Sequence, residues 1–359
     1  MTDDLIFKKF DRTDLSKQRM LFEECFPETK NTEVLSSRHY DWKFNQFPKD
    51  TKSFEYVCYL GNDLIGYYAA IPYSYKVFDQ VAHVGMVCDV MTGIAARGKG
   101  IFTKLGNFAT HDLKKSGITF TTGYPIRKEV IPGHLKVGWE IVFKLPMYIK
   151  FLKFDKFFAT RGLAFLAPLF NSIFYALSFC EALFLSKEPL KFQIASIEEF
   201  TTSSNFSVFI ETWMSETKIA LNKDKDFLRW RFGAPGSQYK VVTMQLEDKL
   251  IGVGIVRSVI QEQVPTLAIL DFMVLAKYSS YSTNLSFEIK RYAIECKDEF
   301  IISMMNPTLY KKYRFLKSLF IRSPFVFKLI LKRLNLNFAK DKLYQESNWH
   351  LMWIDSDDL

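Results

Sequence analysis

The sequence predicts an α/β protein of the layered α+β type, with two domains that each hold a mixed, mostly antiparallel sheet flanked by helices. Three observations lead to this prediction. The chain has 359 residues, which is about two ordinary domains. Each half contains apolar, strand-forming runs followed by an amphipathic helix and another strand. The two halves also repeat one set of motifs in one order, as a duplicated domain would.

Composition narrows the class of protein. Hydrophobic residues make up 48% of the chain and charged residues 24%, which excludes a disordered or fibrous protein. The net charge of +9 predicts a surface that attracts anions such as nucleotides, phosphates or acidic lipids. No basic stripe or nucleic-acid-binding motif accompanies this charge, so a nucleic acid is not the expected partner.

The cysteines and the start of the chain indicate the compartment. Asp3 and Asp4 stand where a secretory leader needs basic residues, so no export signal is expected. We expect reduced thiols, no metal and a cytoplasmic location, because the cysteines are scattered and show no CxxC pair or metal-ligand spacing to histidine. They are Cys25, Cys58, Cys88, Cys180 and Cys296.

The elements follow each other in the same order in both halves. In the first half, turn residues such as Gly61 separate three predicted antiparallel strands at 54–60, 64–72 and 81–91. From Ile101 the apolar residues recur at three and four, which predicts an amphipathic helix that ends at Gly117. A strand at 118–121 follows. The second half predicts strands at 239–245, 250–256 and 266–274, a helix at 284–296 and a strand at 300–304.

Six motif pairs recur in order. Trp42-Lys43-Phe44 returns as Trp230-Arg231-Phe232, and Cys88-Asp89-Val90-Met91 returns as Leu270-Asp271-Phe272-Met273. The other pairs are 63–66 with 249–252, 124–125 with 306–307, 135–139 with 316–320, and Pro146 with Pro324. This order predicts an ancestral duplication rather than a coincidence between two α/β domains. The predicted domains are 1–150 and 191–359, joined by an apolar helical linker or hairpin at 151–190.

A glycine-containing loop, Arg97-Gly98-Lys99-Gly100, lies between a predicted strand and the predicted helix at Ile101. The helix N-terminus presents free backbone N–H groups beside two basic side chains, which together form an anion site. Gly98 and Gly100 allow positive φ and a close approach of the backbone to a phosphate. The spacing fits neither a Walker P-loop nor a GxGxxG loop, so a diphosphate of another kind is expected.

This stretch resembles the signature of the GNAT superfamily of N-acetyltransferases, in which Arg or Gln, two residues, Gly and one residue precede a Gly or Ala. Phe102 stands at that last position here. The resemblance implies that the loop amides hold the pyrophosphate of acetyl-CoA, or another acyl-CoA, as co-substrate. It also implies that the preceding strand pairs with the pantetheine arm. The implied cofactor-binding residues are Val90, Met91, Thr92, Arg97, Gly98, Lys99, Gly100, Ile101 and Phe102.

The resemblance continues to a second segment at 124–139, which implies catalytic candidates. In the superfamily a tyrosine four residues before a Gly-Phe pair protonates the leaving thiolate, and His134, before Gly138, takes that position. Histidine can donate a proton at neutral pH; the alternative is a polar helix residue beside the cofactor groove. Asp89 and Glu129 are candidate bases for the amine. The match of Asp89 with Asp271 equally indicates a shared structural role.

The expected function is therefore transfer of an acetyl or other acyl group from coenzyme A to a small-molecule amine. Resemblance to tandem bacterial enzymes suggests an amino sugar. The second half has Ser279-Ser280-Tyr281-Ser282 in place of the loop, so it resembles a degenerate GNAT-like partner that does not hold coenzyme A. The alternatives are a noncatalytic GNAT-like scaffold and a tRNA-dependent aminoacyl transferase of the related twin-domain type.

An apolar stretch at 162–180 carries no charge and is long enough for a membrane span. Pro168 and Asn171 interrupt it, and basic residues flank both ends. The main expectation is a helix or helical hairpin buried between the two halves. The alternatives are an element in the membrane interface, with a peripheral location at the inner face, and a span. A second basic, apolar stretch at 324–333 is expected either to form a helix on the second sheet or to join such a surface.

Overall fold

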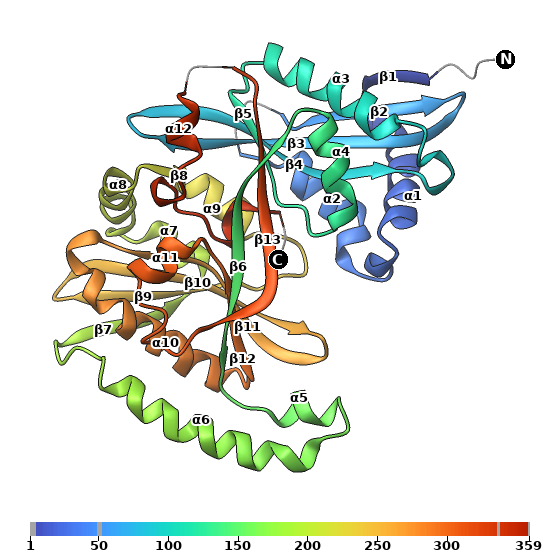
Figure 1. Ribbon diagram of the computed structural model, residues 1–359. Helices are drawn as coiled ribbons and strands as arrows, with labels where there is room; N and C mark the ends of the chain where they lie inside the picture. The colour runs from blue at the N-terminus through green and yellow to red at the C-terminus, as the bar shows by residue number, and fades with distance from the viewer. Residues whose placement is uncertain (1–4, 49–51, 336–337, 358–359) are drawn as a thin grey trace. The chain divides into compact units, whose positions relative to one another are not determined.

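The computed structural model describes residues 5–48, 52–335 and 338–357 (Figure 1). Residues 1–4, which include the acidic pair used to argue against an export signal, lie outside the described residues. The chain forms two compact units, and each is described by itself. Unit 1 comprises Met1–Phe143, Gly233–Gly236 and Lys328–Tyr344, and unit 2 comprises Lys144–Phe232, Ser237–Phe327 and Gln345–Leu359.

Unit 1 contains a mixed, mostly antiparallel sheet. Its strands, in spatial order, are β1 (Leu5–Lys9), β2 (Phe54–Leu60), β3 (Asp63–Val77), β4 (Gln80–Thr92), β5 (Phe120–Gly123) and the end of β13 (Ile321–Arg333). All neighbours are antiparallel except β4 and β5, which are parallel. The strands predicted for the first half are thus confirmed, although β3 and β4 run further than predicted.

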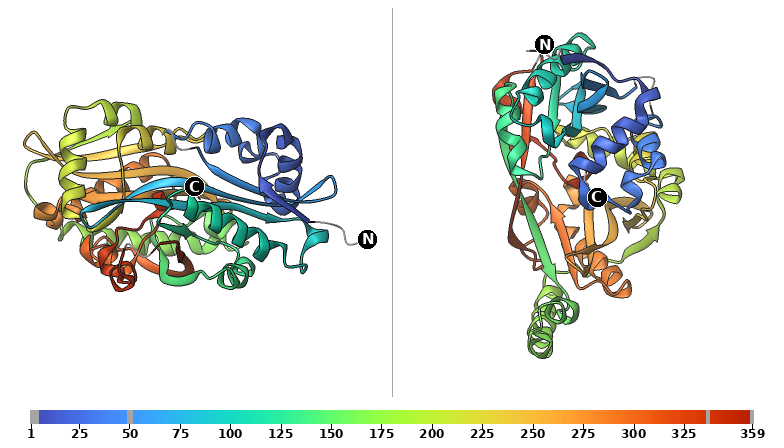
Figure 2. Two further views of the ribbon diagram at one scale, coloured as in Figure 1. Left: turned by 90° about the horizontal axis from the view of Figure 1, so that it is seen from above. Right: turned by 90° about the vertical axis from the view of Figure 1, so that its right-hand side faces the viewer.

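Helices cover both faces of the unit 1 sheet (Figure 2). They are α1 (Leu15–Cys25), α2 (Ser37–Phe44), α3 (Ile101–Lys115), α4 (Ile131–Lys136) and α12 (Lys340–Leu343). The left view of Figure 2 shows α1 and α2 on one face and α3 on the other. Helix α3 places Ile101, Leu105, Ala109 and Leu113 in the core, which confirms the predicted three-and-four spacing.

Unit 2 contains a second mixed sheet. Its strands, in spatial order, are the end of β6 (Glu140–Phe151), β12 (Phe300–Met304), β11 (Val264–Val274), β10 (Lys249–Gln261), β9 (Lys240–Leu246) and β7 (Leu190–Ala195). The parallel pair is β11 with β12. The helices are α5 (Asp155–Ala159), α6 (Ala167–Ala182), α7 (Ile197–Thr202), α8 (Phe206–Glu216), α9 (Lys225–Arg231), α10 (Ser282–Glu295) and α11 (Pro307–Lys312); the short β8 spans Ile219–Leu221.

Each sheet is completed by a strand from the other half of the sequence. The end of β13 pairs with β5, and the end of β6 pairs with β12. The order of elements from α2 to β6 is the same as the order from α9 to β13. This shared order agrees with the repeated motifs, while the duplication itself stays a prediction. The predicted domains 1–150, 151–190 and 191–359 are continuous stretches of sequence. They therefore do not account for the ends of β6 and β13, which each belong to the unit formed mainly by the other half.

Two expectations for apolar segments are wrong. Residues 324–333 form part of strand β13 rather than a helix, because Ile330 to Arg333 find backbone partners on β5. The stretch at 162–180 is expected to be buried, but within unit 2 it forms α6 and its approach, and only 11% of its apolar window is buried. By length and composition, 164–182 is the one helix in the described part of the chain that could cross a membrane.

Candidate functional site

The last part of β4 presents an open backbone edge. The parallel ladder with β5 runs from Val84 to Met86 and then ends, whereas the antiparallel ladder with β3 continues to Thr92. On the side of β4 that faces β5, the backbone groups beyond Met86 therefore have no partner strand among the described residues. Such an edge is a template for hydrogen bonds to an extended amide chain.

The loop after β4 has the geometry of an anion site. Gly98 has φ +78° and Gly100 has φ +75°, and an added Cβ at either position would meet nothing within 4 Å. Glycine is therefore needed for backbone conformation rather than for space. Gly100 is the N-cap of α3, and no side chain in the described part of the chain caps that helix. The first-turn amides of this 15-residue helix are left to a ligand or to solvent.

The open edge and the loop share one cleft of about 460 Å³ in unit 1. Its lining contains every residue predicted to bind the cofactor except Lys99. The hydroxyl oxygen of Thr92 is buried there and lacks a hydrogen-bond partner among the described residues. An unsatisfied polar atom beside free helix amides fits a polar, anionic ligand of the coenzyme A type.

Sequence reasoning missed a second wall of the cleft, formed by Cys25, Phe26 and Lys136. Arg127 also lines the cleft; it donates from Nη1 to the Cys25 carbonyl oxygen at 2.7 Å and lies over the Phe26 ring at 4.8 Å. Burial raises the pKa of the Cys25 thiol. No spacing rule marks these residues, because α1 and α4 reach the cleft only in the folded unit.

Phe102 fits at the position where the family pattern has Gly or Ala because a neighbouring glycine makes room. A Cβ added to Gly133 would lie 2.6 Å from Cδ1 of Phe102. The Phe102 ring also meets the His134 ring edge-on, with 5.0 Å between centroids. The loss of a small residue on α3 is thus matched by a glycine on α4.

His134 is buried and lies outside the lining of the cleft. Its side chain is 4% exposed and packs between Phe102 and Trp139, with 4.9 Å between the His134 and Trp139 centroids. Burial lowers the pKa of His134 to about 4, so the ring is neutral at physiological pH. These observations favour the packing alternative over a proton donor. The catalytic role stays a prediction.

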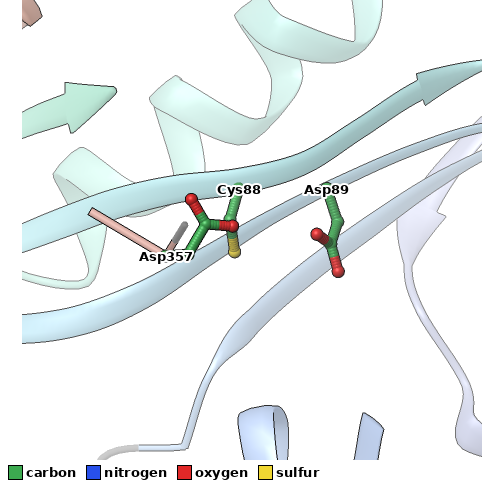
Figure 3. A group of neighbouring side chains, drawn as sticks. All are labelled: Cys88, Asp89 and Asp357. Atoms are coloured by element: carbon green, nitrogen blue, oxygen red, sulfur yellow. The ribbon is translucent and has the colours of Figure 1, made fainter. Parts of the chain in front are cut away.

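Asp89 occupies a bulge in β4, beside Cys88 (Figure 3). Its φ is +47°, and its carboxylate accepts from the Lys43 ammonium at 2.9 Å. Its counterpart in unit 2, Asp271, lies 2.6 Å from the Lys223 ammonium. Burial alone would raise the pKa of Asp271, but Lys223 and a hydrogen bond from His350 outweigh it and the pKa is lowered. Each of the two aspartates is thus paired with one lysine, which favours a shared structural role for Asp89 and Asp271.

Glu129 is the predicted base that lies in the lining of the cleft. It belongs to a short 3₁₀ turn, Lys128–Val130, directly before α4, and its side chain is exposed. A carboxylate at this position can accept a proton from a group that enters the cleft.

The position in unit 2 that corresponds to the loop is covered by the chain itself. Asn284, in the first turn of α10, accepts from the Ser186 amide at 3.1 Å and donates to the Ser186 carbonyl at 3.2 Å. The Thr283 hydroxyl donates to the Phe184 carbonyl at 3.0 Å, and Ser282 is fully buried. The segment after α6 therefore lies against the first turn of α10, whereas in unit 1 no side chain of the described residues caps the first-turn amides of α3.

Known proteins share this fold. Residues 7–142 match the family model described as an acetyltransferase (GNAT) domain. A GCN5-related N-acetyltransferase from Anabaena variabilis ATCC 29413 is 12% identical with a TM-score of 0.62, and the match covers 92% of this chain and 73% of that one. A probable N-acyltransferase of unknown function from Enterococcus faecalis V583 is 11% identical, also with 0.62 and the same coverage.

A third similar structure is the Saccharomyces cerevisiae N-myristoyltransferase with bound myristoyl-CoA, at 10% identity, TM-score 0.61 and coverage of 93% and 79%. No curated protein matches the sequence. The family match covers the domain that holds the cleft, and the structural likeness extends over nearly the whole chain. Residues 7–142 of this chain match the GNAT acetyltransferase domain model, and the chain has the fold of these acyltransferases.

Proposed function

We propose that this protein transfers an acetyl or longer acyl group from coenzyme A to an amine of a small molecule, with an amino sugar as the favoured acceptor class. One observation carries the proposal: the positive-φ glycines of the loop and the open edge of β4 line the same cleft. Acyl-CoA bound there would supply a thioester, whose acyl carbon is activated toward an amine, with coenzyme A as the leaving thiol. The myristoyl-CoA bound to the yeast neighbour supports an acyl-CoA co-substrate without fixing the chain length.

Different residues of unit 1 bind different parts of this co-substrate. Gly98, Gly100 and the first-turn amides of α3 donate to the pyrophosphate, because they are free and lie at the positive end of the helix dipole. The positive charges of Arg97 and Lys136, which line the cleft, favour the same anion. The backbone of Val90 to Thr92 aligns the pantetheine arm, which places the thioester at a fixed point on β4.

We assign proton removal from the amine to Glu129, since its carboxylate lies in the lining of the cleft. The variant Glu129→Gln is expected to bind coenzyme A normally and to lose about 10²-fold or more in turnover. Glu295→Gln changes an exposed carboxyl at the end of α10 in unit 2 and is the matched control. Equal activity of the two variants would remove Glu129 from the mechanism.

The function is tested by measuring thiol release from acetyl-CoA across a panel of amines that includes amino sugars. Turnover with an amine supports the proposal. Failure to bind coenzyme A would refute it and would favour a noncatalytic scaffold. Activity with charged tRNA that survives Gly100→Glu would instead favour an aminoacyl transferase. We further propose a cytoplasmic location, because the cysteines are scattered along the sequence and show no CxxC pair.

A further inference from the structure

Helix α6 has an outer surface that is apolar and exposed. Phe165 just before the helix is 75% exposed; within it Leu169 is 59% and Phe179 62% exposed, and Leu183 just after it is 81% exposed. The right view of Figure 2 shows the helix projecting from the rest of unit 2. Large apolar side chains exposed along a whole helix mark a surface that contacts another apolar phase.

The inner face of α6 is fixed to unit 2. The rings of Phe170 and Phe174 pack on Phe154, with centroid distances of 5.5 and 5.0 Å. The Asn171 amide accepts from the Phe154 N–H at 2.8 Å and donates to the Asp155 carboxylate at 2.8 Å. A helix spanning a bilayer would have to break these contacts, because Asn171 and the Phe170 and Phe174 rings hold it against the rest of unit 2. The helix is therefore suited to lie along a surface.

The one charged residue of α6, Glu181, is turned into the protein. Its carboxylate contacts the Lys150 ammonium and accepts from the Lys290 ammonium at 2.9 Å, and Glu181 itself is fully buried. Burial lowers the pKa of Lys150 to about 8, against the opposing effect of Glu181. An ion pair buried in this way adds little net stability, yet it leaves the outer face of the helix without charge.

Basic residues flank the helix on both sides. Apart from the buried Glu181, residues 151–191 carry five basic side chains, Lys153, Lys156, Arg161, Lys187 and Lys191, against two acidic ones, Asp155 and Glu188. Lys153, Arg161 and Lys191 form ion pairs with Asp155, Glu262 and Asp248, so the positive excess around the helix is small and rests on Lys156 and Lys187. An apolar helix face with positive charge at its ends matches a bilayer with anionic headgroups, whereas a second copy of this basic chain would bring like charges together.

We propose that α6 is a peripheral membrane anchor, which lies in the interface of a bilayer rich in anionic lipid with its outer face among the acyl chains. The exposed apolar side chains insert among the acyl chains, and the flanking lysines are attracted to the anionic headgroups. The contacts to Phe154 hold the helix parallel to the membrane surface. The inference uses unit 2 alone and does not depend on the proposed function.

Flotation of the full chain with vesicles tests the proposal. Vesicles of phosphatidylcholine with about a third phosphatidylglycerol are compared with vesicles of phosphatidylcholine alone, at low and high salt. The test variant is Leu169→Glu/Phe179→Glu, whose sites are exposed, so folding is retained and is checked by circular dichroism. The matched control is Val208→Glu, which is 61% exposed on α8 of the same unit.

The wild-type chain and the Val208→Glu control are expected to float with anionic vesicles, more weakly at high salt. The double variant is expected to bind at least about 100-fold more weakly, since each inserted Leu or Phe side chain contributes roughly tenfold or more. Absence of wild-type flotation at low salt overturns the proposal, and so does unchanged flotation of the double variant. A dimer in solution that the double variant abolishes, without vesicle binding, also overturns it in favour of a second copy of the chain.

Discussion

Substitution of Gly100 by glutamate places a negative charge where the start of α3 is expected to hold a pyrophosphate. Gly100 has φ +75°, and an added Cβ meets nothing within 4 Å, so the side chain enters without a clash. The backbone strain costs about 1–2 kcal/mol of folding stability. At about 6 Å and an effective dielectric constant of about 40, a unit charge pair contributes about 1.4 kcal/mol. Two phosphate charges therefore predict a loss of about 100-fold in affinity for coenzyme A.

The assay is isothermal titration of coenzyme A into the purified full chain. Gly61→Glu is the matched control, because Gly61 also has positive φ and open space around it but lies in the turn between β2 and β3. Gly61→Glu is expected to lose similar stability and to keep the affinity of the wild-type chain. Gly100→Ala, which carries the strain without the charge, should fall between them. Equal affinities for Gly100→Glu and Gly61→Glu would refute the assignment of the loop.

Three further predictions concern stability, measured by urea or thermal unfolding. The pKa of His134 is about 4 in the folded chain and near 6.5 in the unfolded chain, so folding stability is lost as the pH falls from 6.5 to 4, by up to about 1.4 kcal/mol per pH unit. His134→Gln should make stability less dependent on pH in this range. An unchanged pH dependence would contradict the burial of His134. Gly133→Ala should destabilise by about 1–3 kcal/mol through Phe102, although alanine normally favours a helix, and a gain in stability would contradict the predicted contact. Glu181→Ala should cost about 3–5 kcal/mol by leaving Lys150 and Lys290 buried without their carboxylate, whereas a cost below 1 kcal/mol would show that the pair is solvated.

The parts of the fold set by short-range pattern could be predicted from the sequence. Helix α3 follows from its three-and-four spacing, and the loop before it follows from Arg97, Gly98 and Gly100. The positive φ of both glycines agrees with the reason given for them. Strand and helix lengths differ by a few residues, because pairing across the sheet rather than propensity decides where a strand ends.

The features that depend on distant contacts could not be predicted. Nothing local shows that Ile330 to Arg333 pair with β5, or that Cys25 and Phe26 at the end of α1 line the cleft. Helix α6 is the opposite case. Its apolar residues predict removal from water, but composition alone does not tell whether protein or lipid provides the cover.

The proposed function implies that unit 1 binds acyl-CoA, whereas residues 184–186 close the corresponding position in unit 2. Calorimetric stoichiometry tests it most directly, since it counts sites without assuming an acceptor. We expect one coenzyme A bound per wild-type chain, with that single site weakened in Gly100→Glu. Two sites per chain, or none, would contradict it.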